Sequence, residues 1–384
     1  TPMNRFKFST TSSIRFGWGA TSDIGKDFKA SAGRKTLVVT DPGIVKSGLL
    51  DRLISALDTA PVIYDKVEAD PPEAIVQDAT SVACSAGVKA VIGFGGGSSL
   101  DVAKLVALLA CGKEHLGDIY GVNNVRYERL PLALVPTTAG TGSEVTPIAV
   151  VTTAGSEKKG VVSEVLLPDL ALLDPELTVG LPPMVTAATG LDAMVHAIEA
   201  FTSINGNNNP ISKHLARTAL SLLAGAIETA VNNGAERSAR SNMLLGSMLA
   251  GQAFANSPVA AVHALAYPLG GHYHVPHGLS NALVLPHVLR FNIDVCGAAY
   301  SELAAIAFPS LSEIPVEQRS AAFIAEIQKL SKAIGVPQRL RDVGVDSSAL
   351  PILARDAMKQ TRLLINNPKP LTVDDAKQIY QTAW

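Results

Sequence analysis

The stretch from His263 to His277 holds the side chains best suited to metal chemistry. It contains four of the chain's eight histidines, at positions 263, 272, 274 and 277. His263 and His277 are fourteen residues apart, with two prolines and a glycine pair between them. Because proline and glycine interrupt helices, we expect these two histidines to approach a common point from different elements. His272 and His274 are candidates for further ligands, for substrate contacts or for ordinary surface residues.

A second cluster lies about seventy residues upstream, in the segment Gly190-Leu-Asp-Ala-Met-Val-His-Ala-Ile-Glu199. Asp192 and His196 are four residues apart, which places both on one face of a helix. A lone buried histidine is more often a core residue than a ligand, and an acid can be a helix cap. However, Asp192 is flanked by apolar residues, and burying it without a partner would be costly. One carboxylate with two or three imidazoles suits a first-row divalent metal.

The elements that must position these residues differ between the two halves of the chain. In the first half, short apolar runs alternate with helical patterns, which is typical of an α/β domain with a mainly parallel sheet. Five strands are predicted there, at residues 13–16, 35–40, 61–64, 88–94 and 131–135. Beyond Leu181-Pro-Pro183, long helical patterns cover residues 184–203, 211–232, 236–256 and 258–271. We therefore predict an α/β domain over residues 1–181 and an all-helical domain over residues 182–384.

Two loops that follow predicted strands have the composition of phosphate-binding loops. The first, Gly95-Gly-Gly-Ser-Ser99, leads into a helix whose free N–H groups suit a pyrophosphate. It matches neither Gly-x-Gly-x-x-Gly nor the Walker A pattern, and a tight strand-to-helix turn is the alternative interpretation. The second loop, Pro136-Thr-Thr-Ala-Gly-Thr-Gly-Ser-Glu-Val-Thr146, places hydroxyl groups among glycines. Together the two loops predict a dinucleotide site better than either does alone.

Asp41 lies at the end of the first strong strand and has two interpretations. An acid at the carboxyl end of a strand, beside phosphate loops, can bond ribose hydroxyls and repel a 2′-phosphate. The sequence Asp41-Pro-Gly is also ordinary turn chemistry. The residues alone favour neither interpretation.

Composition excludes several classes of function. The net charge of −2 gives no electrostatic case for binding nucleic acid or an anionic membrane. No apolar run is expected to reach the length of a membrane span, since the longest, Val102 to Cys111, contains Lys104. The polar N-terminus shows no leader, and three scattered cysteines favour a reducing compartment, the cytoplasm. Only 17% of residues are charged, so we expect part of the surface to be buried in a homodimer or larger homo-oligomer.

Four segments, in the same order along the chain, resemble the iron-containing (group III) alcohol dehydrogenases. They are Gly-Gly-Gly-Ser-Ser-Leu-Asp-Val-Ala-Lys, Pro-Thr-Thr-Ala-Gly-Thr-Gly-Ser-Glu, Gly-Leu-Asp-Ala-Met-Val-His-Ala-Ile-Glu-Ala and His-Ala-Leu-Ala-Tyr-Pro-Leu-Gly-Gly-x-Tyr-x-x-Pro-His-Gly. The resemblance covers about residues 40–290 and implies a dehydroquinate synthase-like two-domain fold. An N-terminal NAD-binding domain and a helical C-terminal domain would then flank an active-site cleft.

Carried over by position, the resemblance also implies roles for individual residues. The metal ligands would be Asp192, His196, His263 and His277, holding Fe²⁺, with Zn²⁺ or another divalent metal as the alternative. Phe254 matches an aromatic position that lines the substrate pocket in some members. The implied NAD-binding residues are Asp41, Gly95, Gly96, Gly97, Ser98, Ser99, Asp101, Thr137, Thr138, Thr141, Ser143 and Lys159, with Lys158 as the alternative to Lys159.

The expected chemistry is hydride transfer between a small alcohol and NAD, with the metal polarising the alcohol or carbonyl oxygen and no protein nucleophile. One position departs from the family pattern. Many members have a second histidine four residues after the third ligand, where this chain has Tyr267. The proton path therefore stays open among Tyr267, His272, His274, water and a ribose hydroxyl.

Three rival functions differ from a metal-dependent alcohol dehydrogenase. A maleylacetate reductase-like enzyme would have the same fold without metal dependence, and the intact ligand set argues against it. A dehydroquinate synthase-like lyase would need a basic pocket for a phosphorylated sugar acid, and no Lys/Arg cluster lies near the ligand motifs. A non-catalytic metal-binding protein is hard to reconcile with two phosphate-type loops. Which small alcohol or aldehyde is the substrate does not follow from the sequence.

Overall fold

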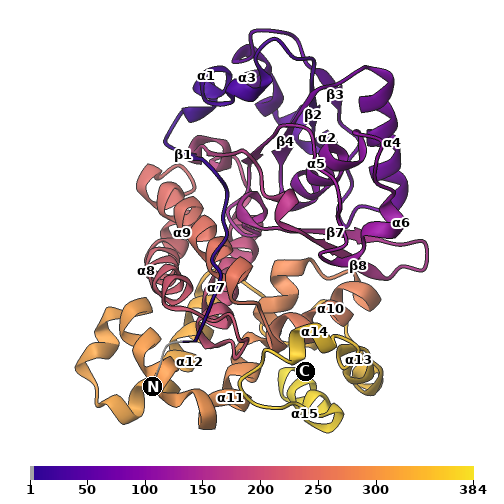
Figure 1. The fold of residues 1–384 in the computed structure, drawn as a ribbon. Helices are drawn as coiled ribbons and strands as arrows, with labels where there is room; N and C mark the ends of the chain where they lie inside the picture. The colour runs from indigo at the N-terminus through magenta and orange to yellow at the C-terminus, as the bar shows by residue number, and fades with distance from the viewer. Residues whose placement is uncertain (1–3) are drawn as a thin grey trace. The chain divides into compact units, whose positions relative to one another are not determined.

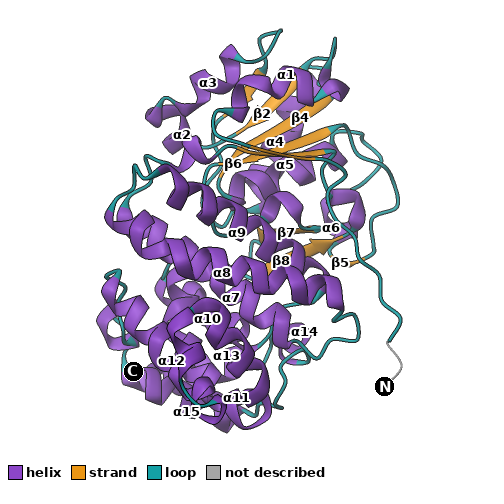
Figure 2. Ribbon diagram, turned by 90° about the vertical axis from the view of Figure 1, so that its left-hand side faces the viewer, coloured by secondary structure: helices purple, strands orange, loops and turns teal. Residues whose placement is uncertain are grey.

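The computed structural model describes residues 4–384. Residues 1–3, which begin the predicted N-terminal domain and the polar N-terminus, lie outside the described residues. The chain forms two compact units. One comprises residues 9–179, and the other comprises residues 180–384 together with the N-terminal residues up to Phe8. Strands occur in the first unit, and within the described residues the second unit is helical (Figure 2).

The first unit is built on a six-stranded sheet in the order β1-β9-β6-β4-β2-β3, and every pair of neighbours is parallel. Figure 1 labels β2, β3 and β4 in the indigo to purple part of the ribbon. The chain passes from β2 outward to β3 and returns to the other side of β2 as β4, so a topological switch point lies between β2 and β4. Ligands of open parallel sheets bind at the carboxyl ends of strands beside such a point. The strands are β1 (Ile14–Phe16), β2 (Thr36–Val39), β3 (Val62–Tyr64), β4 (Ala90–Gly95), β6 (Leu132–Pro136) and β9 (Leu170–Leu173).

The central strands are buried on both faces, because their successive side chains enter two separate cores. Leu37 and Val39 pack on one face in the same core as Leu105, whereas Val38 packs on the other in the same core as Leu53. This explains why these strands are continuous apolar runs rather than alternating ones. The helices of this unit are α1 (Ile24–Asp27), α2 (Pro42–Ser47), α3 (Leu49–Ser55), α4 (Glu73–Ser85), α5 (Gly97–Leu109) and α6 (Leu116–Ile119).

A second, three-stranded sheet in this unit has the order β5-β8-β7. It comprises β5 (Gly121–Val122), β7 (Ile148–Thr152) and β8 (Lys158–Val162), with β7 and β8 antiparallel.

The second unit contains nine α-helices among its described residues and holds the predicted metal ligands. Helices α7, α8 and α9 pack on one another, and α11 packs against α7, α8, α10, α12 and α15. The helices are α7 (Pro183–Thr202), α8 (Pro210–Asn232), α9 (Arg237–Asn256), α10 (Ala261–Tyr273), α11 (His277–Ala307), α12 (Val316–Ala333), α13 (Leu350–Ala357), α14 (Thr361–Leu364) and α15 (Val373–Ala383). The predicted fold class, an α/β sheet domain followed by an all-helical domain, is confirmed.

Helix α11 differs from one sequence expectation. Among the described residues, α11 is the one helix that is both long enough and apolar enough to cross a membrane, although no such run was expected. Half of its most apolar window is buried inside the protein, and the helix packs against five others. Core helices of water-soluble proteins have the same composition, and we interpret α11 in this way.

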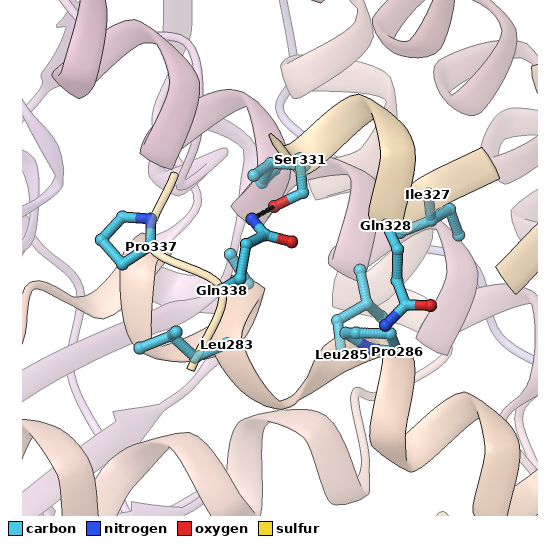
Figure 3. Close-up of a pocket in the computed structure, with 10 residues that line it drawn as sticks. Leu283, Leu285, Pro286, Ile327, Gln328, Ser331, Pro337 and Gln338 are labelled. Atoms are coloured by element: carbon cyan, nitrogen blue, oxygen red, sulfur yellow. Dashed lines mark hydrogen bonds between the residues drawn. The ribbon is translucent and has the colours of Figure 1, made fainter. Parts of the chain in front are cut away.

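A small cavity lies between α11 and α12 (Figure 3). Its volume is about 10 Å³, which is room for about one water molecule. Leu283 and Leu285 form part of its wall, and the Gln338 amide donates a hydrogen bond to Ser331 Oγ at 3.3 Å. The cavity is too small for an alcohol substrate.

Candidate metal centre and nucleotide loops

Helix α7 presents the first two predicted ligands from one helical turn. Asp192 and His196 are both buried, and Asp192 Oδ1 lies 3.5 Å from His196 Nε2. The surrounding positions of the helix, including Leu191, Ala193 and Val195, are apolar and buried. The Asp192–His196 pair is therefore flanked along the helix by apolar side chains.

The other two predicted ligands come from the starts of two successive helices. His263 is the third residue of α10, and His277 is the first residue of α11. Between them, α10 ends at Tyr273, His274 follows in a left-handed conformation as its C-cap, and Val275 and Pro276 lead into the next helix. This turn brings His277 back towards His263, and their ring centroids are 5.4 Å apart.

The four side chains form a donor set that fits a metal ion. One ligand atom from each of Asp192, His196, His263 and His277 lies within 4.8 Å of the other three. Asp192 Oδ1 is 3.5, 3.7 and 3.4 Å from the Nε2 atoms of the three histidines, in chain order. In a tetrahedral site with ligands at about 2.0–2.2 Å, neighbouring donor atoms lie about 3.3–3.6 Å apart. The three distances from Asp192 are close to this spacing, and all four donor atoms lie near enough to one another to hold one ion.

The charge state of Asp192 also suits a ligand. Burial alone would raise the pKa of the carboxyl, but the charges of His196, His277 and His263 outweigh it and lower the pKa well below its usual value. The carboxylate is therefore ionised at neutral pH, and it is the one anion in the donor set.

Glu199 holds the imidazole of His263 from the side away from the donor set. It lies two turns after Asp192 on α7 and is itself buried. Its Oε1 lies 2.7 Å from His263 Nδ1, while Oε2 accepts a hydrogen bond from the backbone N–H of Val262 at 3.0 Å. An ionised carboxylate can only accept, so Nδ1 carries the proton and Nε2 presents its lone pair to the donor set.

Asn281 approaches the donor set from the next turn of α11 after His277. It is fully buried, and its amide donates to Asp192 Oδ1 at 2.7 Å. The same nitrogen lies 3.2 Å from His277 Nε2 and 3.4 Å from His263 Nε2. An amide N–H cannot ligate a metal, so Asn281 supports the carboxylate rather than adding a fifth ligand.

The first phosphate-type loop joins β4 to α5 beside the end of β2. Gly95 has a φ of +154°, and an added Cβ would lie 2.9 Å from Ser99 and 3.2 Å from Asp41 Oδ2. Ser99 Oγ also donates weakly to Asp41 Oδ2, at 3.4 Å. Asp41 in turn accepts the Ile44 N–H at 3.0 Å and caps α2. Asp41 is therefore both a helix cap and a neighbour of the glycine loop.

The two loops contact each other at the carboxyl ends of adjacent strands. β4 and β6 pair through Gly95 and Pro136, and Thr137 N–H donates to the Gly95 carbonyl at 2.9 Å. A Cβ on Gly97 would lie 2.8 Å from Thr141, and one on Gly96 would lie 3.7 Å from Thr138. This close approach favours glycine at position 97, and no side-chain hydrogen bond caps the N-terminus of α5.

Comparisons with known proteins agree with this geometry. Residues 11–175 match the model of the iron-containing alcohol dehydrogenases, and residues 186–384 match the C-terminal model of the same family. The chain belongs to the iron-containing alcohol dehydrogenase family.

Several relatives match this chain over nearly the full length of both proteins. The chain is 40% identical over 374 residues to long-chain-alcohol dehydrogenase 1 of Geobacillus thermodenitrificans, covering 96% of this chain and 94% of the relative. A crystal structure of 1,3-propanediol oxidoreductase matches with a TM-score of 0.95 at 34% identity, over 99% of this chain and 100% of that one. Sulfoacetaldehyde reductase from Bifidobacterium kashiwanohense in complex with NAD⁺ matches with a TM-score of 0.89 at 30% identity, over 99% and 98%.

The family and the reaction class predicted from the sequence are confirmed. As an iron-containing alcohol dehydrogenase, the chain is an NAD-linked oxidoreductase that interconverts alcohols and aldehydes. The protein also has the metal site of this family in Asp192, His196, His263 and His277.

Two of the four predicted substrate or proton-path residues lie against the metal ligands of this alcohol dehydrogenase. The Phe254 ring centroid is 4.3 Å from that of His196, and the Tyr267 centroid is 6.1 Å from that of His277. Phe254 is one helical turn past Ala250 on α9, and Tyr267 is one turn past His263 on α10. The two aromatic rings contribute an apolar wall beside the donor set.

The structure does not bring His272 or His274 to the donor set. His272 is nine residues after His263, which is two and a half turns and therefore the opposite side of α10. Its Nε2 pairs with Asp356 on α13, and Asp356 also pairs with Lys359. His274 is exposed at the end of α10 with a φ of +54°, so its contribution is to the turn.

Two of the predicted NAD contacts in this alcohol dehydrogenase are engaged with a buried lysine. Lys104 is fully buried, and its Nζ donates to Ser143 Oγ at 2.9 Å and to the Ile148 carbonyl at 2.8 Å. Asp101 lies 3.6 Å from the ammonium and accepts the Ser143 hydroxyl at 2.6 Å. Asp101 and Ser143 therefore join α5 to the second loop through contacts within the protein.

The lysines of β8 lie at the second sheet. Lys158 pairs with Asp70 at 2.8 Å, and Lys159 Nζ stands 5.6 Å from the centre of the Tyr120 ring. These contacts, among the described residues, hold both side chains near the surface of the small sheet.

Sequence reasoning missed Glu199, Asn281 and Lys104. Glu199 and Asn281 each lie one turn from a predicted ligand, at i+3 from His196 and i+4 from His277, which was the available signal. Lys104 carried a different signal, because it was the single charge in the apolar run from Val102 to Cys111.

Proposed function

We propose that this iron-containing alcohol dehydrogenase binds one divalent ion, Fe²⁺ in the cell, through Asp192, His196, His263 and His277, and oxidises a small alcohol with NAD. The observation that carries the proposal is that four donor atoms from three helices lie within 4.8 Å of one another. Zn²⁺ suits the same donors, and iron is preferred because the family is iron-containing.

The bound ion would supply Lewis acidity to an alcohol or carbonyl oxygen. The protein's part is to present the donors and to shape their surroundings. Glu199 fixes the protonation and rotation of His263, and Asn281 fixes the carboxylate of Asp192. Phe254 and Tyr267 place apolar rings beside His196 and His277 and limit the access of water to them.

NAD would bind to the unit that holds the two glycine-containing loops, and it supplies the hydride acceptor. Gly95, Gly96 and Gly97 leave room for the pyrophosphate at the N-terminus of α5, and Ser98 and Ser99 offer hydroxyl groups there. Thr137, Thr138 and Thr141 line the neighbouring loop. Asp41, which lies beside Gly95, would accept from ribose hydroxyls and disfavour a 2′-phosphate, and Lys159 would be a further contact.

Among the three predicted proton-path residues, Tyr267 is the best supported, because its ring lies beside His277 whereas His272 is paired with Asp356. We therefore assign Tyr267 the proton-handling position near the substrate oxygen. Its phenol can donate and accept, so it can pass a proton towards water.

The proposed substrate class is small alcohols and their aldehydes or ketones. Relatives named for long-chain alcohols, 1,3-propanediol and sulfoacetaldehyde differ in length and charge, so their substrates do not transfer directly. A cytoplasmic compartment is supported by the three free cysteines, Cys84, Cys111 and Cys296. A homodimer or larger assembly is supported by the exposed apolar residues Ile14 and Phe16 on the edge strand β1.

The test compares the wild type with Asp192→Asn on a panel of alcohols with NAD and of aldehydes with NADH. Asp294→Asn is the matched control, because Asp294 pairs with Lys369 away from the donor set. We expect the wild type and the control to form NADH when alcohol is added. We expect Asp192→Asn to lose both this activity and its bound metal. An Asp192→Asn protein that turns over at the wild-type rate would contradict the proposal.

A further inference from the structure

Glu199 accepts hydrogen bonds both from the backbone at the start of α10 and from the ring of the metal ligand His263. Helix α10 begins after Ala260, whose side chain cannot cap it. Glu199, from α7, takes the place of the missing cap by accepting the N–H of Val262 at 3.0 Å and that of His263 at 3.4 Å. The same carboxylate accepts from His263 Nδ1 at 2.7 Å.

This arrangement ties the backbone position of His263 to the state of its ring. The N–H groups at a helix start have no partner within the helix, and a negative charge is favourable there. Because Glu199 is buried, with 4% of its surface exposed, water cannot replace it at this helix start. The ring of His263 therefore sits at a fixed height on α10 with its Nδ1 proton held away from the metal donors.

We propose that Glu199 is a positioning residue for the metal ion: it fixes both the place of His263 and its Nδ1-protonated form, so that Nε2 is ready to bind. This inference rests on the metal site of the proposed function. The two functions of Glu199 need two acceptor oxygens, one for the ring of His263 and one for the backbone N–H of Val262. Only a carboxylate supplies both from a single side chain of this length.

The isosteric variant Glu199→Gln separates these needs. An amide has one acceptor oxygen and one donor nitrogen. If the oxygen accepts from the His263 ring, the amide nitrogen faces the Val262 N–H, and two donors then oppose each other. If the amide is turned over, its nitrogen faces His263 Nδ1 and favours the wrong ring form. Either orientation weakens the presentation of Nε2.

Helix α9 provides a matched control. Glu236 caps α9 by accepting the N–H groups of Ser238 at 3.1 Å and Ala239 at 2.7 Å, and it touches none of the metal donors. Glu236→Gln thus repeats the loss of a carboxylate at a helix start without the link to a ligand. Any effect shared by both variants reports capping, and an effect confined to Glu199→Gln reports metal positioning.

The experiment measures metal binding directly. Dissociation constants for Co²⁺ and Zn²⁺ are obtained by competition with a chromophoric chelator, and the visible spectrum of the Co²⁺ protein reports the ligand field. We expect Glu199→Gln to bind about 10- to 100-fold more weakly, the range for partners of metal-bound histidines, and to have an altered Co²⁺ spectrum. Glu236→Gln should match the wild type in both.

Two results would overturn the inference. One is Glu199→Gln binding Co²⁺ within twofold of the wild type with the same spectrum. The other uses the wild type alone, should the variant not fold: ¹⁵N-labelled histidine spectra of the Zn²⁺ protein in which no slowly exchanging Nδ1 proton is found on His263. A wild type that binds neither metal would instead refute the proposed function, and this inference with it.

Discussion

Replacing Lys104 by methionine should destabilise the unit that holds the nucleotide loops. The ammonium is fully buried and satisfies Ser143, Thr146 and the Ile148 carbonyl, with Asp101 at 3.6 Å. Methionine preserves most of the volume of lysine but offers no donor. The variant therefore leaves acceptor groups unsatisfied and the Asp101 carboxylate without its cation.

The size of the effect follows from the burial of the two partners. Removing one partner of a buried ion pair costs about 3–5 kcal/mol. Asp101 retains 17% of its side-chain exposure, and Ser143 and the Val150 N–H still donate to it, so the lower end applies. Burial raises the pKa of Asp101 and the charge of Lys104 opposes this rise, so the variant should also protonate Asp101 more readily. We predict a loss of about 3 kcal/mol.

Urea unfolding followed by circular dichroism measures this loss, and NAD binding measured by fluorescence shows whether the loops are affected. The double variant Asp101→Asn/Lys104→Met should lose less than the sum of the two single variants, because the charge that Lys104→Met leaves behind is absent. Two findings would refute the reasoning. The first is a Lys104→Met protein within 1 kcal/mol of the wild type, and the second is strict additivity in the double variant.

Three further predictions concern single side chains. Burial raises the pKa of Glu144 to about 7, so the folded protein keeps a proton that the unfolded chain releases near the usual glutamate pKa of 4.5. The free energy of unfolding should therefore fall as pH rises between these two values, by up to roughly 3 kcal/mol. Unfolding of Glu144→Gln should lack this dependence on pH. Asp41→Gly should relax the preference for NAD, read as the ratio of kcat/KM for NAD and NADP, and an unchanged ratio would exclude Asp41 from ribose recognition. Tyr267→Phe should lower kcat and change its pH profile with metal content unchanged; wild-type values of both would remove Tyr267 from the proton path.

The fold was accessible from the sequence because its signals are local. The runs at Leu37–Val39 and Leu132–Val135 are continuously apolar since both faces of the sheet are covered, and this pattern predicts a parallel sheet directly. The change to helical periodicity near Leu181 is equally local. The expectation that no apolar run is long enough to span a membrane was wrong at α11, because this 31-residue core helix is long and apolar enough by composition alone.

The site was only partly accessible, because several of its contacts are distant in sequence. The four-residue spacing of Asp192 and His196 indicates a shared helix face. In contrast, Glu199 contacts His263, which is 64 residues away in the sequence, and Asn281 contacts Asp192, which is 89 residues away. Asp101 lies in a motif associated with the cofactor, yet its side chain turns to a lysine three residues later. Motif membership placed Asp101 in the right region, while side-chain direction needed the three-dimensional structure.

The most direct test of the central claim is a metal titration of the alcohol dehydrogenase reaction. The protein is stripped with a chelator and then titrated anaerobically with Fe²⁺, or with Zn²⁺ in parallel, while alcohol-dependent NADH formation is recorded. We predict no activity in the stripped protein and a rate that rises with added metal and saturates at one ion per chain. Full NADH formation by the stripped protein would contradict a metal centre at Asp192, His196, His263 and His277 that the reaction depends on.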